Sequence, residues 1–185
     1  MGLLRLSMIW ESSYWKDDLL RQAKMLRFRV QHKRWSESSS AKLEQTLMGG
    51  FYAVRKLIES KKLTDSLTSK AIQVTEFAAA SKPVHLYNWH HIDRLYKLDT
   101  PKKAKIDLLS LCHQFVHSYI FLLSFDEDRK LQGVFVTSDR KRSSCLYHIE
   151  VQKVIDIFEQ VGHNYPTKSM STWNEKTGDY RIGNS

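Results

Sequence analysis

Two histidines four residues apart are the side chains of this sequence best suited to chemistry. His113 and His117 lie in the otherwise apolar run LSLCHQFVHSYIFLLSF, residues 109–125. On a helix, residues i and i+4 share a face, so the two imidazoles are expected to be neighbours. Imidazole transfers protons near neutral pH and also binds metals. The pair could therefore be a reactive site, part of a metal site, or the polar edge of a core helix.

The helix expected to carry this pair begins near Lys102, with Thr100 as its N-cap and a proline in the first turn. At about 100° per residue, apolar side chains fill roughly half of its circumference, and both histidines fall on the remaining polar strip. Cys112 points into the middle of the apolar arc, where burial raises the pKa of a thiol and makes it inert. We therefore interpret Cys112 as a core residue and not as a nucleophile.

A metal site would need ligands beyond this pair, because structural zinc takes four ligands and catalytic zinc usually three from the protein. Only His85, His90 or His91 could supply a third imidazole, and no HExxH motif accompanies the pair. The sequence also lacks CxxC spacing and the GxxxxGK, GxGxxG and GxSxG motifs. We expect no metal and no cofactor.

The segment LCHQFVHSY resembles the last-helix motif of HEPN domains, which are small helical bundles of bacterial defence and toxin systems. In that family an arginine and a histidine cleave RNA at a dimer interface without metal. The family histidine falls on His117, the neighbouring polar residue on His113, the aromatic on Tyr119, and the arginine on Cys112. The resemblance implies a homodimer in which His117 and His113 are the catalytic candidates and the arginine is missing. The chain, including GFYAVRKLIESKKLTDS, is also similar to an uncharacterised bacterial family without an assigned activity.

A net charge of +9 favours an anionic partner, with nucleic acid first and an acidic protein second. Residues 1–35 hold eight Lys and Arg against three Asp and Glu, and the turn 139–144 holds three consecutive cations. Both clusters could instead be ordinary solvated surface. The candidate nucleic-acid contacts are Arg21, Lys24, Arg27, Lys33, Arg34, Arg140, Lys141 and Arg142.

Hydrophobic periodicity predicts an α+β fold that is predominantly helical, a helical bundle with a small antiparallel β-meander at about 119–151 and a final helix. The first strand of the meander could instead continue the preceding helix. We expect one domain, residues 1–162, followed by a loosely held tail, 163–185. The expected helices are 12–35, 41–62, 67–80, 89–98, one from about 102, and 152–162.

These features predict a basic, HEPN-like protein that binds nucleic acid, RNA rather than DNA, without strong catalytic activity. One alternative is a metal-independent endoribonuclease of a toxin or phage-defence system, and another is a non-enzymatic component of a bacterial complex. The aromatic and basic segment 89–96 is either a further RNA contact or a partly exposed helix. No run approaches the roughly 18 apolar residues of a membrane span, so no membrane partner is expected. The two cysteines form no disulfide framework, so a cytoplasmic location is expected.

Overall fold

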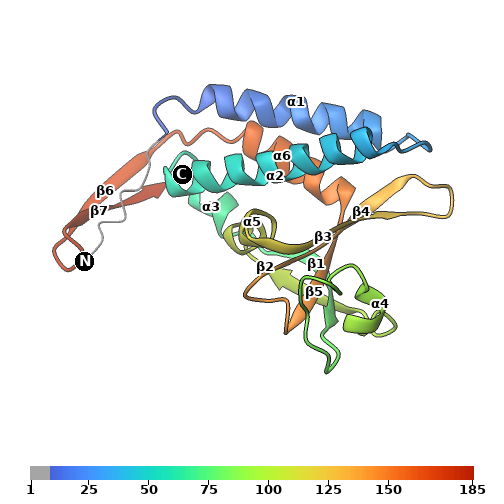
Figure 1. Ribbon diagram of the computed structural model, residues 1–185. Helices are drawn as coiled ribbons and strands as arrows, with labels where there is room; N and C mark the ends of the chain where they lie inside the picture. The colour runs from blue at the N-terminus through green and yellow to red at the C-terminus, as the bar shows by residue number, and fades with distance from the viewer. Residues whose placement is uncertain (1–8) are drawn as a thin grey trace.

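A five-stranded antiparallel sheet forms the centre of the computed structural model, which describes residues 9–185 (Figure 1). The strand order is β2-β1-β5-β4-β3, so β2 and β3 are the two edges. The first eight residues of the expected domain 1–162 lie outside the described part. The strands are β1 (Ile72–Ala78), β2 (Lys102–Ile106), β3 (Ser118–Phe125), β4 (Leu131–Ser138) and β5 (Cys145–Glu150).

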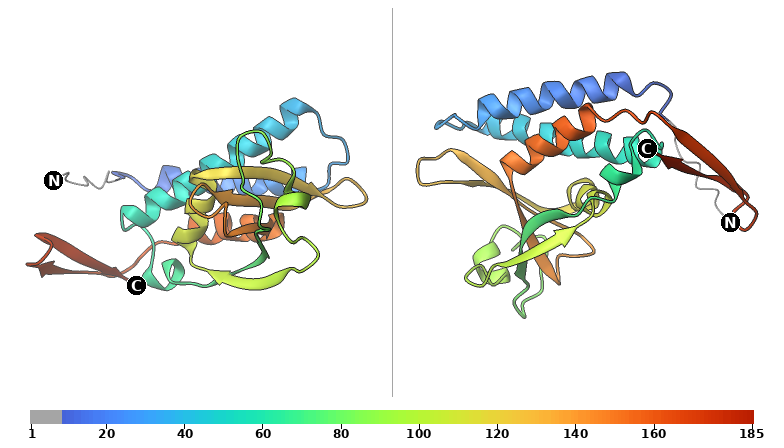
Figure 2. Two further views of the ribbon diagram at one scale, coloured as in Figure 1. Left: turned by 60° about the horizontal axis from the view of Figure 1, so that its bottom comes forward. Right: turned by 180° about the vertical axis from the view of Figure 1, so that it is seen from behind.

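Four helices pack on one face of the sheet, and α1 forms the outermost layer over α2 and α6 (Figures 1 and 2). The main core lies between these helices and the sheet because each helix turns an apolar stripe inward. At its start, α2 is fixed by reciprocal hydrogen bonds between Ser36 and Ser39. The helices are α1 (Ser13–Arg29), α2 (Glu37–Glu59), α5 (Leu108–Val116) and α6 (Val151–Gly162).

The other face of the sheet is covered by the long connection between β1 and β2, which contains the short helix α4 (Ile92–Leu95) (Figure 1). Here Tyr96 packs with Ile120 and Leu146 in a second, smaller core. The Tyr96 hydroxyl donates a hydrogen bond of 2.7 Å to the carbonyl of Arg142, which ties the connection to the β4–β5 turn. The helix expected at 89–98 is therefore reduced to four residues.

The predicted helical bundle is wrong, because two segments expected to be helical are strands. Only α3 (Asp65–Thr68) is helical at the start of the expected helix 67–80, and the chain then forms β1. Likewise β2 replaces the first turns of the helix expected from Lys102. In β2, Ala104 and Ile106 pack against the main core between lysines, a period of two. Pairing of β1 with β5, about seventy residues later, completes the sheet and overrides the local helical signal.

The predicted β-meander and final helix are confirmed, whereas the first helix ends at Arg29 instead of residue 35. The meander consists of β3, β4 and β5 in consecutive antiparallel pairs, and α6 ends at Gly162 as predicted. Residues 163–185 contain a hairpin of β6 (Ser169–Asn174) and β7 (Asp179–Asn184). The Asn184 amide donates hydrogen bonds to the carbonyls of Lys61 and Leu63. The loose attachment expected for these residues stays a prediction.

Close packing of α2 against α5 and α6 sets the position of the candidate site. Phe51 of α2 stacks on Phe115 of α5 with ring centroids 3.9 Å apart. Gly50 makes room for the buried ring of Phe158 on α6, which a β-carbon at that position would overlap. Phe115 lies at the end of α5 and Phe51 about two turns before the end of α2, so their stacking brings the C-terminal parts of the two helices together.

Candidate functional site

A pocket of about 590 Å³ opens between the last turns of α2 and α5, the end of β2 and the turn that follows β4. Its volume lies within the range of small-molecule sites in proteins. The lining combines cations, imidazoles and hydroxyl groups with few apolar side chains. The lining residues are Arg55, Ile106, Ser110, His113, Gln114, His117, Ser138, Asp139, Arg140, Lys141 and Tyr147.

The two histidines lie at the C-terminal end of α5 and not in the middle of a long helix. Asp107 caps the start of α5 by accepting hydrogen bonds from the backbone and side chain of Ser110. The helix ends at Val116, His117 is its C-cap, and β3 follows at once. The two imidazole centroids are 6.0 Å apart. The helix is shorter than predicted, but the predicted proximity of the two rings is confirmed.

The buried side chain of Gln114 fixes this end of α5 to the turn after β4. Its oxygen accepts a hydrogen bond of 3.0 Å from the backbone of Ser138, and its nitrogen donates to the Ser110 carbonyl. The Asp139 backbone also donates to the His117 carbonyl at 3.0 Å. The histidines and the basic turn are therefore held in a fixed relative position.

Arg55 of α2 supplies an arginine at this site that the HEPN-like motif lacks. Its Nη1 lies 3.0 Å from Nε2 of His117, and its Nε donates to Glu59 at 2.7 Å. Only about a quarter of its side chain is exposed. Because guanidinium has no acceptor, His117 must present an unprotonated Nε2 to receive this bond. The other N–H groups of Arg55 make no hydrogen bond within the described residues.

The surroundings of the pocket favour the neutral form of His113, which can accept a proton. Burial lowers the pKa of the His113 imidazole, and the positive charge of Arg55 lowers it further. Burial opposes ionisation of Glu59, but hydrogen bonds from Arg55 and Lys56 hold the pKa of its carboxyl below the usual range. An entering anion would therefore meet a fixed cation and an imidazole that can still accept a proton.

The basic turn contributes two of its three predicted cations to the pocket. Arg140 and Lys141 line the pocket and are exposed. Arg142 faces elsewhere: its guanidinium lies over the ring of Tyr119 at 3.9 Å and pairs with Asp139 at 3.3 Å.

None of the cations predicted on α1 and its following loop lines this pocket. Arg27 makes a two-pronged ion pair with Glu159 at 2.6 and 2.9 Å, so much of its charge is neutralised within the protein. Arg21 pairs with Asp18 and Lys33 with Asp128. Lys24 and Arg34 have no ion pair within residues 9–185. The predicted basic residues therefore fall into two groups, those that line the pocket and those on α1 and its following loop, which do not.

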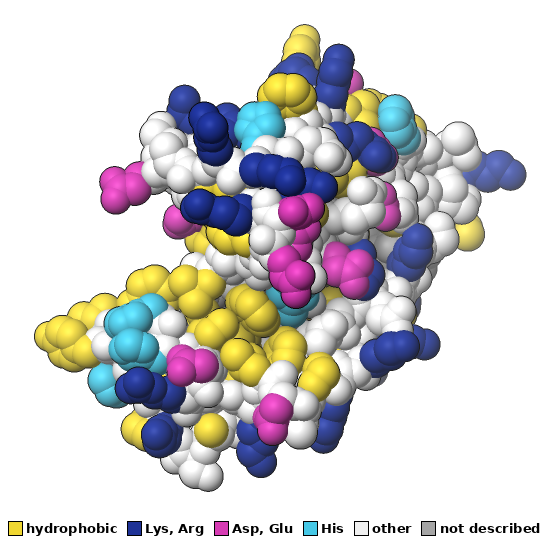
Figure 3. Space-filling model, turned by 90° about the vertical axis from the view of Figure 1, so that its right-hand side faces the viewer, with side chains coloured by type: hydrophobic (Ala, Val, Ile, Leu, Met, Phe, Trp, Pro, Cys, Tyr) yellow, Lys and Arg dark blue, Asp and Glu magenta, His cyan; other side chains and the backbone are white. Residues whose placement is uncertain are grey.

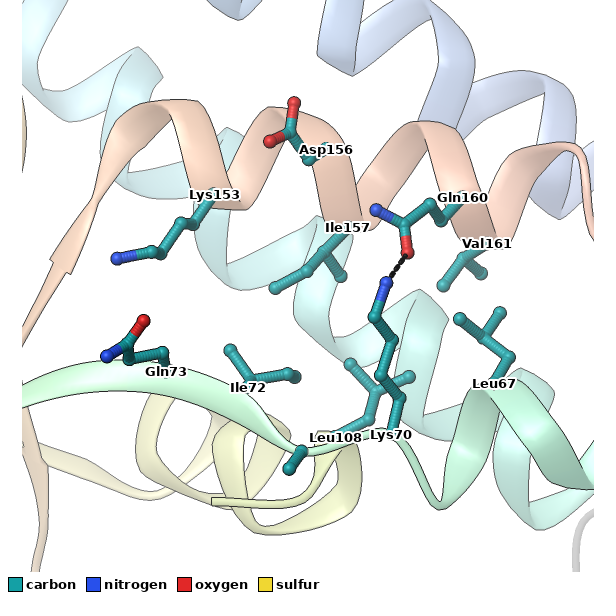
Figure 4. Close-up of a pocket in the computed structure, with 11 residues that line it drawn as sticks. Leu67, Lys70, Ile72, Gln73, Leu108, Lys153, Asp156, Ile157, Gln160 and Val161 are labelled. Carbon is teal, nitrogen blue, oxygen red and sulfur yellow. Dashed lines mark hydrogen bonds between the residues drawn. The ribbon is translucent and has the colours of Figure 1, made fainter. Parts of the chain in front are cut away.

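A second, smaller cavity of about 160 Å³ lies between α6 and the start of β1 (Figure 4). Its walls are mainly apolar, with Leu67, Ile72 and Ile157 pointing into it, and Lys70 donates a hydrogen bond of 2.8 Å to Gln160 across it. It holds no imidazole or thiol, and its charged groups are Lys70, Lys153 and Asp156. The arrangement offers no acid and base pair comparable to the histidine pocket.

Cys112 is completely buried, as the sequence predicts, and burial raises the pKa of its thiol. Within the part of the chain that the structure describes, no three His, Cys, Asp or Glu side chains cluster as metal ligands. No helix in residues 9–185 is both long and apolar enough to cross a bilayer.

Comparisons with known protein families, with curated proteins and with solved structures found no match. The HEPN resemblance thus rests on the motif alone, and the helical bundle that it implies is not the fold of this chain.

Sequence reasoning missed Arg55, the side chain that most changes the chemistry of the pocket. Its position one turn after Phe51 gives no sign that it meets His117, because only the packing of α2 on α5 brings them together. The i, i+4 spacing of Arg55 and Glu59 predicts an ion pair, but it does not indicate that Arg55 belongs to a functional site.

Proposed function

We propose that this protein binds RNA by holding a backbone phosphate in the pocket formed by Arg55, His113 and His117. The observation that carries the proposal is the contact between Arg55 and His117, which places a fixed cation beside an imidazole. Arg140 and Lys141 border the same pocket and supply charge for a neighbouring phosphate. The net charge of +9 favours association with a polyanion.

RNA is preferred to DNA because the pocket offers partners for a 2′-hydroxyl. The carboxylate of Asp139 and the imidazoles accept hydrogen bonds, and Ser110 also lines the wall. A 2′-hydroxyl both donates and accepts, and is what distinguishes RNA from DNA at a given site. The two cysteines are free thiols, in keeping with a reducing cytoplasm as the place of action.

Fluorescence anisotropy with a short single-stranded RNA and its DNA counterpart tests the proposal. Affinity is expected to fall as salt rises, with a slope that reports the number of phosphate contacts. The double variant R140E/K141E should bind at least about tenfold more weakly and with a shallower salt slope. The charge-matched control K168E/K176E, on exposed residues near and in the β6–β7 hairpin, should differ little.

A third variant, K24E/R34E, tests whether the cations on α1 and its following loop also bind RNA. It should weaken binding less than R140E/K141E. The proposal fails if low-salt binding is absent, if salt has no effect, or if the pocket and control variants weaken binding equally. Co-purification with an acidic protein and no nucleic-acid absorbance would instead favour the protein-interaction alternative.

A second candidate function, metal-independent endoribonuclease, is favoured by the same contact together with the 6.0 Å separation of the two imidazoles. One histidine would take the proton of the 2′-hydroxyl while the 2′-oxygen forms a bond to phosphorus. The phosphorus–O5′ bond would break, and the second histidine, which enters the step as an imidazolium, would protonate the departing oxygen. Arg55 would stabilise the charge on the phosphorane-like transition state.

Cleavage in the presence of EDTA, with a 2′,3′-cyclic phosphate as product, tests this second candidate. His117→Ala and His113→Ala should each lower the rate by at least about a hundredfold. A substrate with a single 2′-deoxy substitution at the cleaved position should resist. Activity that survives His117→Ala, or that requires a divalent metal, excludes the mechanism without affecting the binding proposal.

A further inference from the structure

The two edges of the central sheet differ sharply in how they are protected against pairing with another strand. The edge strand β2 carries Lys102, Lys103 and Lys105, and edge lysines discourage such pairing. The opposite edge, β3, has the sequence SYIFLLSF, with no charged residue and no proline. It is hydrogen-bonded to β4 alone, so the outer N–H and C=O groups of its backbone have no strand partner in the described chain.

Apolar side chains surround this unprotected edge. Phe125, at the end of β3, is 39% exposed, and Leu122 and Leu123 are only partly buried. The space-filling view shows an apolar hollow between the helical layer above and the β1–β2 connection below (Figure 3). Such a surface, continuous with an open strand edge, is typical of an interaction site.

The connection between β1 and β2 extends past this edge. Its residues Val84 and Trp89 pack in the same cluster as Ile120 of β3. Viewed onto the face of the sheet that carries this connection, the loop crosses β3 and reaches beyond it (Figure 2, left). Leu86 and Tyr87 in this loop are 68% and 82% exposed, although both are large and hydrophobic.

We propose that β3 pairs in antiparallel orientation with β3 of a second copy of this chain, joining two five-stranded sheets across a twofold axis at Leu122. A twofold axis perpendicular to the sheet keeps each side chain on its own face, so paired residues must be separated by an even number of positions. Centring on Leu122 pairs Phe121 with Leu123 of the second copy, and Ile120 with Ser124. All of these side chains are apolar or small.

Charge complementarity at the two ends of β3 favours a second copy over other strands. The turn after β3 begins with Asp126, Glu127 and Asp128, of which Asp128 is already paired with Lys33 and Lys130, whereas the basic turn 139–142 lies beside the start of β3. Antiparallel pairing brings the acidic end of one copy to the basic end of the other, twice.

The same symmetry covers the exposed loop residues. Since the two β1–β2 connections lie on the same side of the joined sheet, the loop that extends past β3 in one copy lies over the edge of the corresponding face of the other. There Leu86 and Tyr87 would meet the partly buried Leu122 and Phe135 of the second copy. This interface borders the histidine pocket, since the basic turn 139–142 contributes to both. Assembly is measured without RNA, so the proposal does not depend on RNA binding.

Sedimentation or light scattering of the wild-type protein tests the assembly directly. A mass of twice 21.7 kDa is expected at micromolar concentration. Hydrogen exchange should become slower in β3 as the protein concentration rises, and should not change in β2. Leu122→Lys should give a monomer, because two lysines would then face each other at the axis.

Disulfide trapping tests the register independently of that variant. Leu122→Cys should form a disulfide-linked dimer under mild oxidation, since a residue on the twofold axis lies opposite itself at a distance that a disulfide can span. Lys103→Cys, on the other edge, is the matched control and should stay monomeric. The native cysteines are both buried and should not interfere.

A monomeric wild-type protein at about 50 μM whose Leu122→Cys variant does not cross-link overturns the proposal. So does a dimer in which Lys103→Cys cross-links and β3 exchanges at a rate independent of concentration. A monomer that recruits a different protein along β3 would likewise exclude pairing between copies.

Discussion

Nη1 of Arg55 lies 3.0 Å from Nε2 of His117, although 62 residues separate them in the sequence. The contact joins the last turn of one helix to the C-cap of another, and the stacked rings of Phe51 and Phe115 hold the two helices at this distance. An arginine and a histidine are thus neighbours here, even though the HEPN-like motif has Cys112 at its arginine position.

Replacing Arg55 by alanine is expected to weaken RNA binding about tenfold, because the variant loses a charge-assisted contact worth roughly 1.4 kcal/mol. Arg55→Lys should restore little of the lost affinity, since a lysine ammonium cannot contact both Glu59 and His117 as the planar guanidinium does. Anisotropy titration measures the effect. Arg181→Ala removes an exposed arginine from β7 and serves as the control. Equal losses in Arg55→Ala and Arg181→Ala would contradict a specific role for Arg55.

RNA affinity is expected to rise as the pH falls from about 8 to about 5.5. Burial and the positive charge of Arg55 lower the pKa of His113 in the free protein, and a bound phosphate raises it again. Binding therefore takes up a proton, and affinity gains at most about tenfold per pH unit. Anisotropy at constant ionic strength measures the slope. His113→Ala should flatten it, whereas the exposed His90→Ala should not; an unchanged slope in His113→Ala would refute this linkage.

The stability of the free protein should change with pH in the opposite sense. Because the pKa of His113 is lower in the folded state, the unfolded chain binds more protons in the window below the ordinary histidine value of about 6.5. The contribution of neutral His113 is thus present above this window and is lost as the pH falls through it. Urea unfolding of the wild type and of His113→Ala across this range measures the effect. The stability of the wild type relative to the variant should fall as the pH falls, and a difference that is constant with pH would contradict the linkage.

Replacing each of the two adjacent glycines of α2 by alanine is expected to have opposite effects on the free energy of unfolding. A β-carbon on Gly49 would have no atom of a neighbouring element within 4 Å, so Gly49→Ala should raise the free energy of unfolding by about 0.5–1 kcal/mol. Gly50→Ala should lower it by about 1–3 kcal/mol, since the new methyl group overlaps the buried ring of Phe158. Chemical denaturation of both variants is the test, and a stabilised Gly50→Ala would mean that α2 and α6 pack less closely than described.

Lys16 is a buried cation that joins the ends of two helices. Its ammonium donates to the carbonyl of Lys62, just beyond α2, at 3.0 Å and to that of Asn164, just beyond α6, at 2.6 Å. Lys16→Met should lower the free energy of unfolding by about 1–3 kcal/mol, because both carbonyls lose a partner. Lys24→Met, on the exposed side of the same helix, should change it little. If the two variants unfold alike, the bonds of Lys16 add nothing to stability.

Local sequence patterns were sufficient to predict much of this protein. Strong helical periodicity located α1, α2 and α6, and β-branched and aromatic runs located the three strands of the meander. The i, i+4 spacing placed His113 beside His117, and the apolar surroundings of Cys112 predicted its burial. Each of these features depends on interactions between residues close in sequence, which composition and spacing record.

Tertiary structure decided the features that depend on distant partners. The segments of β1 and β2 are strands because β1 finds β5, and no local signal carries that pairing. Arg55 becomes part of the histidine pocket, and Arg27 is neutralised by Glu159, only after helices pack. The sequence by itself determined which side chains could do chemistry. The fold determined which of them meet, because packing against a shared core sets distances that no spacing along the chain specifies.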